Sequence, residues 1–197
     1  DTQCDSLIAV GGGSVIDTAK GVGMVLAQAG HDLLDSAGCE VLPRGKHVPF
    51  VAVPTTAGTG SEATLVAVVA NPAIQVKMEF LSYHLLPDVA VLDPRMTETL
   101  PPRITAATGF DALVHATESF LSPHRKTITS EMFSAKAMDM ILKGFKLIDE
   151  KGQDARFEYL DEFVTASFYA GIAFLKAGCG PVHGMSFPLG GTYRSEE

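Results

Sequence analysis

The stretch AVGGGSVIDTAK, residues 9–20, decides the fold. The apolar run just before the glycines, SLIAV at residues 6–10, predicts a short buried β-strand. After the glycines, apolar residues recur with helical spacing as far as Gly30, which is a plausible helix end. Ser14 and Asp17 fit a capping box, which predicts that the helix begins there. A strand, a glycine-rich turn and a capped helix together indicate an α/β domain.

Two loops rich in small residues are candidates for phosphate binding. Glycines let the backbone approach a ligand closely, and the N-terminus of a helix offers free N–H groups, so the first loop could hold a pyrophosphate. An ordinary strand-to-helix turn has the same composition, and the loop is neither GxGxxG nor a P-loop. The second loop, PTTAGTGSEAT at residues 54–64, also follows a predicted strand, and Thr59 and Glu62 could form a second capping box. Such loops at the ends of neighbouring strands favour a nucleotide or dinucleotide ligand.

The rest of the chain divides into two regimes. The pattern predicts further strands at 47–56, 63–70, 76–82 and 87–94, then helices at 103–121, 127–148, 154–176 and from near 180. We therefore expect an α/β nucleotide-binding domain with a partial parallel sheet over residues 1–100, joined at Pro101-Pro102 to an all-α domain over residues 101–197. One crossover helix is too few to cover both faces of a parallel sheet, so either the pattern misses further helices or part of that sheet precedes residue 1.

Composition excludes several classes of protein. Of the 197 residues, 46% are hydrophobic and 19% charged, which is typical of a globular domain. The net charge is −8 and no Lys/Arg run occurs, so a nucleic-acid or anionic-membrane surface is not expected. No apolar run approaches the ~20 residues of a membrane span. The cysteines Cys4, Cys39 and Cys179 form no CxxC pair, so we expect a reducing, cytoplasmic compartment.

A metal site is suggested by GFDALVHATE, residues 109–118. Asp111 and His115 are four positions apart, so a helix places them side by side, and Glu118 shares their face. Most such pairs are incidental. A third candidate, His183, follows far along the chain in GPVHGMSFPLGG. One aspartate and two histidines suit Fe²⁺ or Zn²⁺ and leave a coordination position open for a substrate.

Five blocks together resemble the iron-containing (group III) alcohol dehydrogenases, members of the dehydroquinate synthase-like superfamily. In chain order they are GGGSVIDTAK, PTTAGTGSE, AVLDP, PPRITAATGFDALVHATE and GPVHGMSFPLGG. The resemblance implies a metal-dependent dehydrogenase that transfers a hydride between NAD or NADP and a small alcohol, aldehyde or ketone. It also implies a dimer or larger homo-oligomer, and a longer protein of which this chain is a central portion.

The resemblance also implies roles for particular residues. Gly12, Gly13 and Ser14 would hold the pyrophosphate, with Asp17 beside them. The nicotinamide side would be lined by Thr55, Thr56, Thr59 and Thr64, and Lys77 would contact the cofactor. Asp111, His115 and His183 would bind the metal, Fe²⁺ or alternatively Zn²⁺.

Two positions depart from the family pattern. The fourth metal ligand of the family is a histidine at the position of Glu197, and a second histidine often stands at the position of Phe187. These departures keep open a degenerate, non-catalytic homologue. A glycerol-dehydrogenase-like or dehydroquinate-synthase-like enzyme is the other alternative, although the GFDALVHATE pattern fits the iron-type enzymes better.

Overall fold

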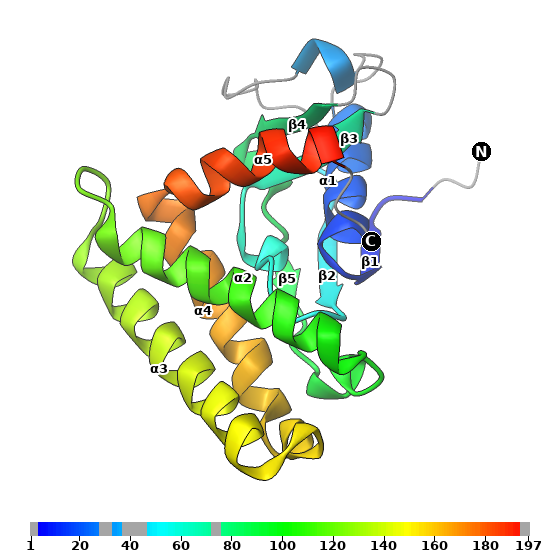
Figure 1. The fold of residues 1–197 in the computed structure, drawn as a ribbon. Helices are drawn as coiled ribbons and strands as arrows, with labels where there is room; N and C mark the ends of the chain where they lie inside the picture. Colours follow the sequence, from blue (N-terminus) through cyan, green and yellow to red (C-terminus); the bar gives the residue numbers. More distant parts are fainter. Residues whose placement is uncertain (1–3, 28–32, 37–46, 72–75, 194–197) are drawn as a thin grey trace.

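The computed structural model describes residues 4–27, 33–36, 47–71 and 76–193. Strands and short 3₁₀ turns occupy the first half of the chain, and long helices the second (Figure 1). The strands are β1 (Leu7–Gly11), β2 (Phe50–Pro54), β3 (Val66–Asn71), β4 (Val76–Leu81) and β5 (Val89–Ala90). The α-helices are α1 (Gly13–Ala27), α2 (Pro102–Leu121), α3 (Ile128–Lys151), α4 (Leu160–Ala177) and α5 (Pro181–Tyr193). The 3₁₀ turns are η1 (Leu33–Ser36), η2 (Ser61–Ala63), η3 (Tyr83–Leu85), η4 (Pro94–Thr97) and η5 (Gln153–Tyr159).

The predicted parallel sheet is present but small. Its strand order is β1-β2-β5, and both pairings are parallel. Helix α1 packs on one face, where Ile16 meets Ala9, Phe50 and Ala52 in a buried cluster. On the other face of β1 the side chain of Ile8 is 71% exposed. Within the described residues, therefore, only one face of this edge strand is covered.

The strands predicted at 63–70 and 76–82 do not join the parallel sheet, which corrects that expectation. β3 and β4 pair antiparallel in a sheet of their own, with Val66 opposite Leu81 and Asn71 opposite Val76. The reason is the connection: only residues 72–75 separate the two strands, whereas a parallel crossover needs a dozen or more residues.

Two elements, β5 and α4, are shorter than the sequence pattern predicts, and each borders a 3₁₀ segment. The strand predicted at 87–94 is reduced to Val89–Ala90, because Asp93 caps a 3₁₀ turn whose first residue is Pro94. The helix predicted at 154–176 begins at Leu160, after the 3₁₀ segment η5. The predicted helix end at Gly30 lies outside the described residues.

Both predicted capping boxes are wrong. The helix α1 begins one residue earlier than predicted, and the Gly12 carbonyl accepts its first hydrogen bonds, from the N–H groups of Val15 and Ile16 at 3.1 Å. The turn at 61–63 starts from Gly60 in the left-handed region, without a side-chain cap. In each case the expected capping partner is used elsewhere: Asp17 bonds across to another element, and Glu62 is buried.

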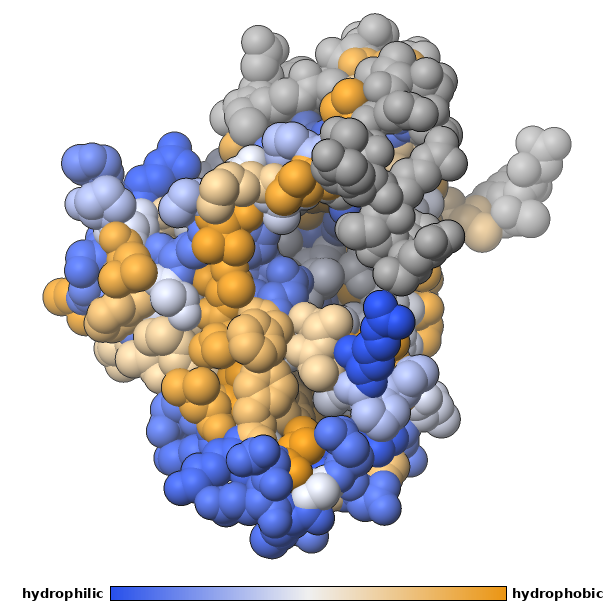
Figure 2. All heavy atoms as spheres, viewed as in Figure 1, coloured by the Kyte–Doolittle hydropathy of each residue, from blue (hydrophilic) through white to orange (hydrophobic). Residues whose placement is uncertain are grey.

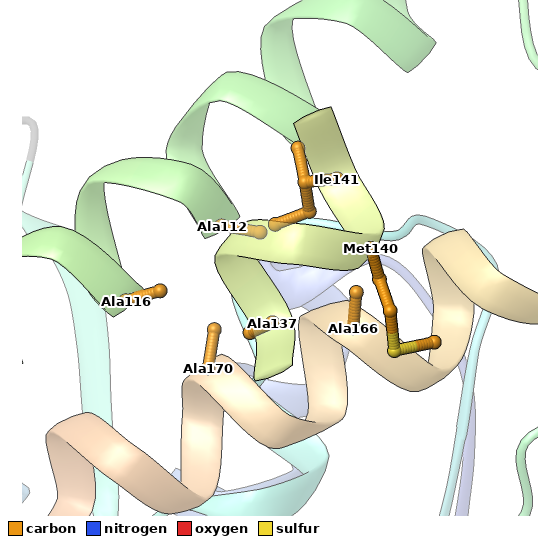
Figure 3. Close-up of a cluster of buried hydrophobic side chains, with 7 residues drawn as sticks. All are labelled: Ala112, Ala116, Ala137, Met140, Ile141, Ala166 and Ala170. Carbon is orange, nitrogen blue, oxygen red and sulfur yellow. The ribbon is translucent and has the colours of Figure 1, made fainter. Parts of the chain in front are cut away.

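The helical half is built on small side chains. Five buried alanines lie where α2, α3 and α4 meet, together with Met140 and Ile141 (Figure 3). Alanine side chains let the helix backbones approach closely, which explains how three long helices form one tight bundle. None of the helices in the described ranges has the length and apolarity needed to cross a membrane.

The two halves meet through the loop that precedes η2. A Cβ on Gly58 would lie 2.8 Å from the Thr108 carbonyl oxygen in α2. Gly60 has φ 60°, and a Cβ there would lie 2.8 Å from Cα of Gly171 in α4. Only glycine permits both the left-handed backbone and this approach. The second glycine-rich loop is therefore held against the helices that carry the predicted metal ligands.

Candidate functional site

The two glycine-rich loops lie against each other. The Thr55 N–H donates to the Gly11 carbonyl at 2.9 Å, which joins the ends of β1 and β2. A Cβ on Gly13 would lie 2.7 Å from Thr59 Cγ2, and one on Gly12 would lie 3.3 Å from Thr56 Cγ2. The helix α1 begins at this junction, and the first N–H groups of an α-helix have no partner within the helix. Backbone donors and threonine side chains thus gather at the carboxyl edge of the parallel strands.

Two of the residues predicted to contact the cofactor are engaged within the chain. The Asp17 carboxylate accepts from Ser61 Oγ at 2.5 Å and from the Val68 N–H at 2.9 Å. The side chain of Thr64 is buried, and its Oγ1 accepts from Lys20 Nζ at 3.2 Å. Their contacts join α1 to η2 and β3, while cofactor binding by these residues stays a prediction.

A second site forms where the start of α5 lies against α2. Helix α2 places Asp111 and His115 one turn apart, with His115 Nδ1 4.0 Å from Asp111 Oδ2. Helix α5 brings His183 to the same place, with Nε2 3.5 Å from Asp111 Oδ1. The two imidazoles stack with their centroids 4.3 Å apart and 17° between their planes. The structure therefore brings together all three residues predicted to bind a metal.

The pKa shifts of His115 and Asp111 favour the forms of these two side chains that bind a metal. Burial lowers the pKa of His115 to about 4, against an opposing effect of Asp111, so its ring is neutral at pH 7. Its Nδ1 is buried and has no hydrogen-bond partner. Burial acts to raise the pKa of Asp111, but the hydrogen bond to His183 and nearby positive charges outweigh it, so the pKa is lowered. A carboxylate beside a neutral imidazole that has one unpartnered nitrogen is a donor set that fits a divalent cation.

Glu118 is a further residue of this cluster, and the sequence indicated it only by its position on the same helix face. Its carboxylate accepts from the N–H groups of Gly180 at 2.8 Å and Val182 at 2.6 Å, and it pairs with His183 Nδ1 at 2.6 Å. The hydrogen bond to Asp111 raises the pKa of His183, and the one to Glu118 adds to that effect. Glu118 thus holds both the start of α5 and the orientation of the His183 ring, leaving Nε2 toward Asp111.

Cys179 is a neighbour that sequence reasoning missed. A potential ligand atom from each of His115, Cys179 and His183 lies within 4.8 Å of the other two. Nothing in the local sequence signals this, because Cys179 is a single cysteine and its partners are distant in the chain. Cys179 is an exposed residue, but partial desolvation of its thiol, followed by the charges of Glu118 and Asp111, raises the pKa of that thiol to about 12.

The remaining predicted residues are placed as follows. Lys77 is an exposed residue of β4, and its charge is near enough to help lower the pKa of Asp111. Glu197 lies outside the described residues, and so does the side chain of Phe187. Whether these two departures from the family's histidines affect the site therefore stays a prediction.

Comparison with known proteins identifies relatives over nearly the whole chain. The family model described as iron-containing alcohol dehydrogenase matches residues 1–94. The model described as the C-terminal part of the Fe-containing alcohol dehydrogenase family matches residues 105–195. The 4-hydroxybutyrate dehydrogenase of Clostridium kluyveri is 43% identical, over 98% of this chain and 51% of its own length. The NAD-dependent methanol dehydrogenase of Bacillus methanolicus is 38% identical, over 98% of this chain and 49% of its own.

Solved structures give the same result. A 1,3-propanediol oxidoreductase superposes with a TM-score of 0.88 and 38% identity, over 98% of this chain and 49% of the other. Sulfoacetaldehyde reductase from Bifidobacterium kashiwanohense, solved in complex with NAD⁺, superposes with a TM-score of 0.85 and 34% identity, over 96% and 50% of the two chains. The chain thus spans about half the length of the relatives it matches.

Proposed function

This chain belongs to the iron-containing alcohol dehydrogenase family, and we propose that it takes part in hydride transfer between NAD(P) and a small alcohol or its carbonyl product. The observation that carries the proposal is the convergence of Asp111, His115 and His183 from two helices, with one buried imidazole nitrogen left without a partner. An incidental polar stripe would not bring a third ligand from a distant helix, nor leave a buried polar atom unsatisfied.

Asp111, His115 and His183 would hold the metal, Fe²⁺ or Zn²⁺. When bound, the metal supplies Lewis-acid polarisation of the substrate oxygen, and the nicotinamide gives or accepts the hydride. The residues of the chain prepare this chemistry. The low pKa of His115 keeps its nitrogen lone pair available at neutral pH, and Asp111 contributes negative charge. Glu118 orients His183, as carboxylate partners of metal-bound histidines commonly do.

The cofactor would lie along the junction of the two glycine-rich loops. Gly12, Gly13 and Ser14 would bind the pyrophosphate through the start of α1, where free amides and the helix dipole favour an anion. Thr55, Thr56 and Thr59 would line the nicotinamide side of the cofactor site, next to the metal, because their loop packs directly on α2. Asp17 and Thr64 would support that loop from within, and Lys77 would contact the cofactor from β4.

The relatives support a primary alcohol or aldehyde as substrate. Their names specify 4-hydroxybutyrate, methanol and 1,3-propanediol, which all carry a primary hydroxyl group. NAD is supported by the NAD-dependent methanol dehydrogenase and by the NAD⁺ complex of the sulfoacetaldehyde reductase.

The test combines metal content with activity. The full chain is loaded with Fe²⁺ or Zn²⁺, and NADH or NADPH oxidation is followed with short aldehydes. Asp111→Ala and His183→Ala should each lose bound metal and slow the reaction on the order of 10²-fold or more, because the polarising charge is lost. His124→Ala, which removes an exposed histidine beyond the end of α2, is the matched control and should change neither.

Two results would contradict the proposal. Metal content that is negligible, or unaffected by both substitutions, would rule out the metalloenzyme. Phosphate elimination from a suitable substrate without NAD(P)H oxidation would favour the synthase-like alternative.

A further inference from the structure

A thiol lies among the ligands of the proposed metal site. The ligand atoms of His115, Cys179 and His183 are all within 4.8 Å of one another. We propose that Cys179 is itself a ligand, so that this chain binds its metal through a carboxylate, two imidazoles and a thiolate. The inference rests on the proposed function, because it concerns the same metal.

The backbone holds Cys179 in place from both sides. On one side, α4 ends at Gly178, whose φ of 77° suits glycine and whose N–H donates to the Phe174 carbonyl at 2.7 Å. On the other side, the Gly180 N–H donates to Glu118 Oε2 at 2.8 Å. A Cβ on Gly180 would lie 2.9 Å from Glu118 Oε1, so the carboxylate is pressed against this segment. The same Glu118 carboxylate thus positions both His183 and the segment that carries Cys179.

The spacing of the donor atoms is close to that of a metal centre. Tetrahedral bonds of about 2.0–2.3 Å place ligand atoms about 3.5 Å apart. The observed limit of 4.8 Å for the three atoms therefore requires a contraction of about 1 Å. Asp111 stands outside this group of three, with carboxylate oxygens 3.5 Å from His183 Nε2 and 4.0 Å from His115 Nδ1. A second observation points to a ligand here: the buried Nδ1 of His115 has no hydrogen-bond partner. A buried polar atom without a partner is costly, and a bound cation would satisfy it.

The chemistry of sulfur gives this site a preference. The thiol releases its proton to solvent as sulfur binds the metal, and the thiolate is a soft donor that favours Zn²⁺ over Fe²⁺. Four protein donors still allow substrate to bind, because zinc sites can expand to five-coordinate. We therefore expect this chain to select zinc more strongly than a site made only of carboxylate and imidazoles.

Cobalt substitution tests the proposal by spectroscopy. The metal-free full chain is titrated with Co²⁺, whose visible bands report binding and whose near-ultraviolet sulfur-to-cobalt band reports a thiolate ligand. The wild-type chain should show both. Cys179→Ser should lose the sulfur band and bind cobalt at least about tenfold more weakly, the lower end of the cost of losing even an outer partner of a ligand. Cys4→Ser, which alters an exposed cysteine, should keep the band.

A measurement on the wild-type chain avoids any folding defect of the variant. In the wild-type chain loaded with Zn²⁺, X-ray absorption at the zinc edge should show a sulfur neighbour at about 2.3 Å. Cobalt binding without a sulfur band, or a band that persists in Cys179→Ser, would overturn the inference and leave the metal site standing. Failure to bind cobalt at all would overturn the metal site and, with it, the proposed function.

Discussion

At the scale of single residues, two stacked histidines are given opposite properties by their surroundings. His115 is enclosed between His183 and Phe174, and burial lowers its pKa to about 4. The ring of His183 lies between the carboxylates of Asp111 and Glu118, and the hydrogen bond to Asp111 raises its pKa. One imidazole is therefore a ready neutral ligand, while the two carboxylates favour the protonated form of the other, and a metal would bind in competition with that proton.

Glu118 provides the test at this scale. Glu118→Gln replaces an acceptor-only group with an amide, which cannot accept from His183 and from two backbone N–H groups equally well. We expect zinc affinity to fall about 10- to 100-fold, as measured by competition with a chromophoric chelator. Glu150→Gln, at an exposed i,i+4 pair with Lys146, should leave affinity unchanged. Equal affinities for Glu118→Gln and the wild type would show that Glu118 does not position the ligand.

At the scale of elements, the loop between β2 and η2 links the sheet to the helices. One side of it contacts the glycines of the first loop, and the other packs on α2 and α4. Glycine is required at the points of contact, because no side chain fits between the backbones. The distance between the proposed cofactor and metal sites is therefore set by the packing of this loop.

Gly171→Ala tests that packing. The added Cβ would lie 2.9 Å from the Gly60 carbonyl oxygen and 3.0 Å from Ala63 Cβ. Overpacking of this kind lowers the free energy of unfolding by about 1–3 kcal/mol, which exceeds the helix gain of about 0.5–1 kcal/mol for replacing glycine. Urea unfolding should show a net loss.

The matched control for that substitution is Gly184→Ala in α5, where a Cβ meets nothing within 4 Å. This variant should be unchanged or slightly stabilised. Similar stability of the Gly171→Ala and Gly184→Ala variants would mean that the loop is not tightly held against α4.

At the scale of the whole molecule, hydrophobic surface is left uncovered. Ile8 is 71% and Val10 54% exposed on one face of the edge strand β1. Phe110 of α2 and Met185 and Leu189 of α5 are also exposed. Figure 2 shows hydrophobic side chains gathered on the face in view. Uncovered strand edges and apolar patches favour association with other protein surfaces.

We therefore expect the 197-residue chain to self-associate in a concentration-dependent manner, as measured by sedimentation velocity. The double variant Ile8→Thr, Val10→Thr keeps residues that favour strands but weakens the apolar face, so it should shift the equilibrium toward monomer. Ile128→Thr, at a 79% exposed position that begins α3, controls for the loss of any surface hydrophobe. If the chain is monomeric at all concentrations, or if Ile128→Thr shifts the equilibrium as much as the double variant, the β1 face does not mediate self-association.

Residue patterns by themselves determined much of this protein. The glycine-rich turn after β1, the order of strands before helices, and the Asp111–His115 pair all depend on local rules of spacing and backbone conformation, so they can be predicted from neighbouring residues. The bounds of α2 and the start of α3 match prediction for the same reason.

Only the tertiary structure decided the rest. In the folded chain, β3 and β4 pair as an antiparallel hairpin. Asp17 and Glu62 do not form the expected caps. Glu118 and Cys179 lie beside the histidines. These outcomes join residues far apart in the chain, where the competition for a partner is settled by burial and packing. No local pattern records which of two available hydrogen-bond partners a buried carboxylate will take, because that choice depends on what surrounds it after folding.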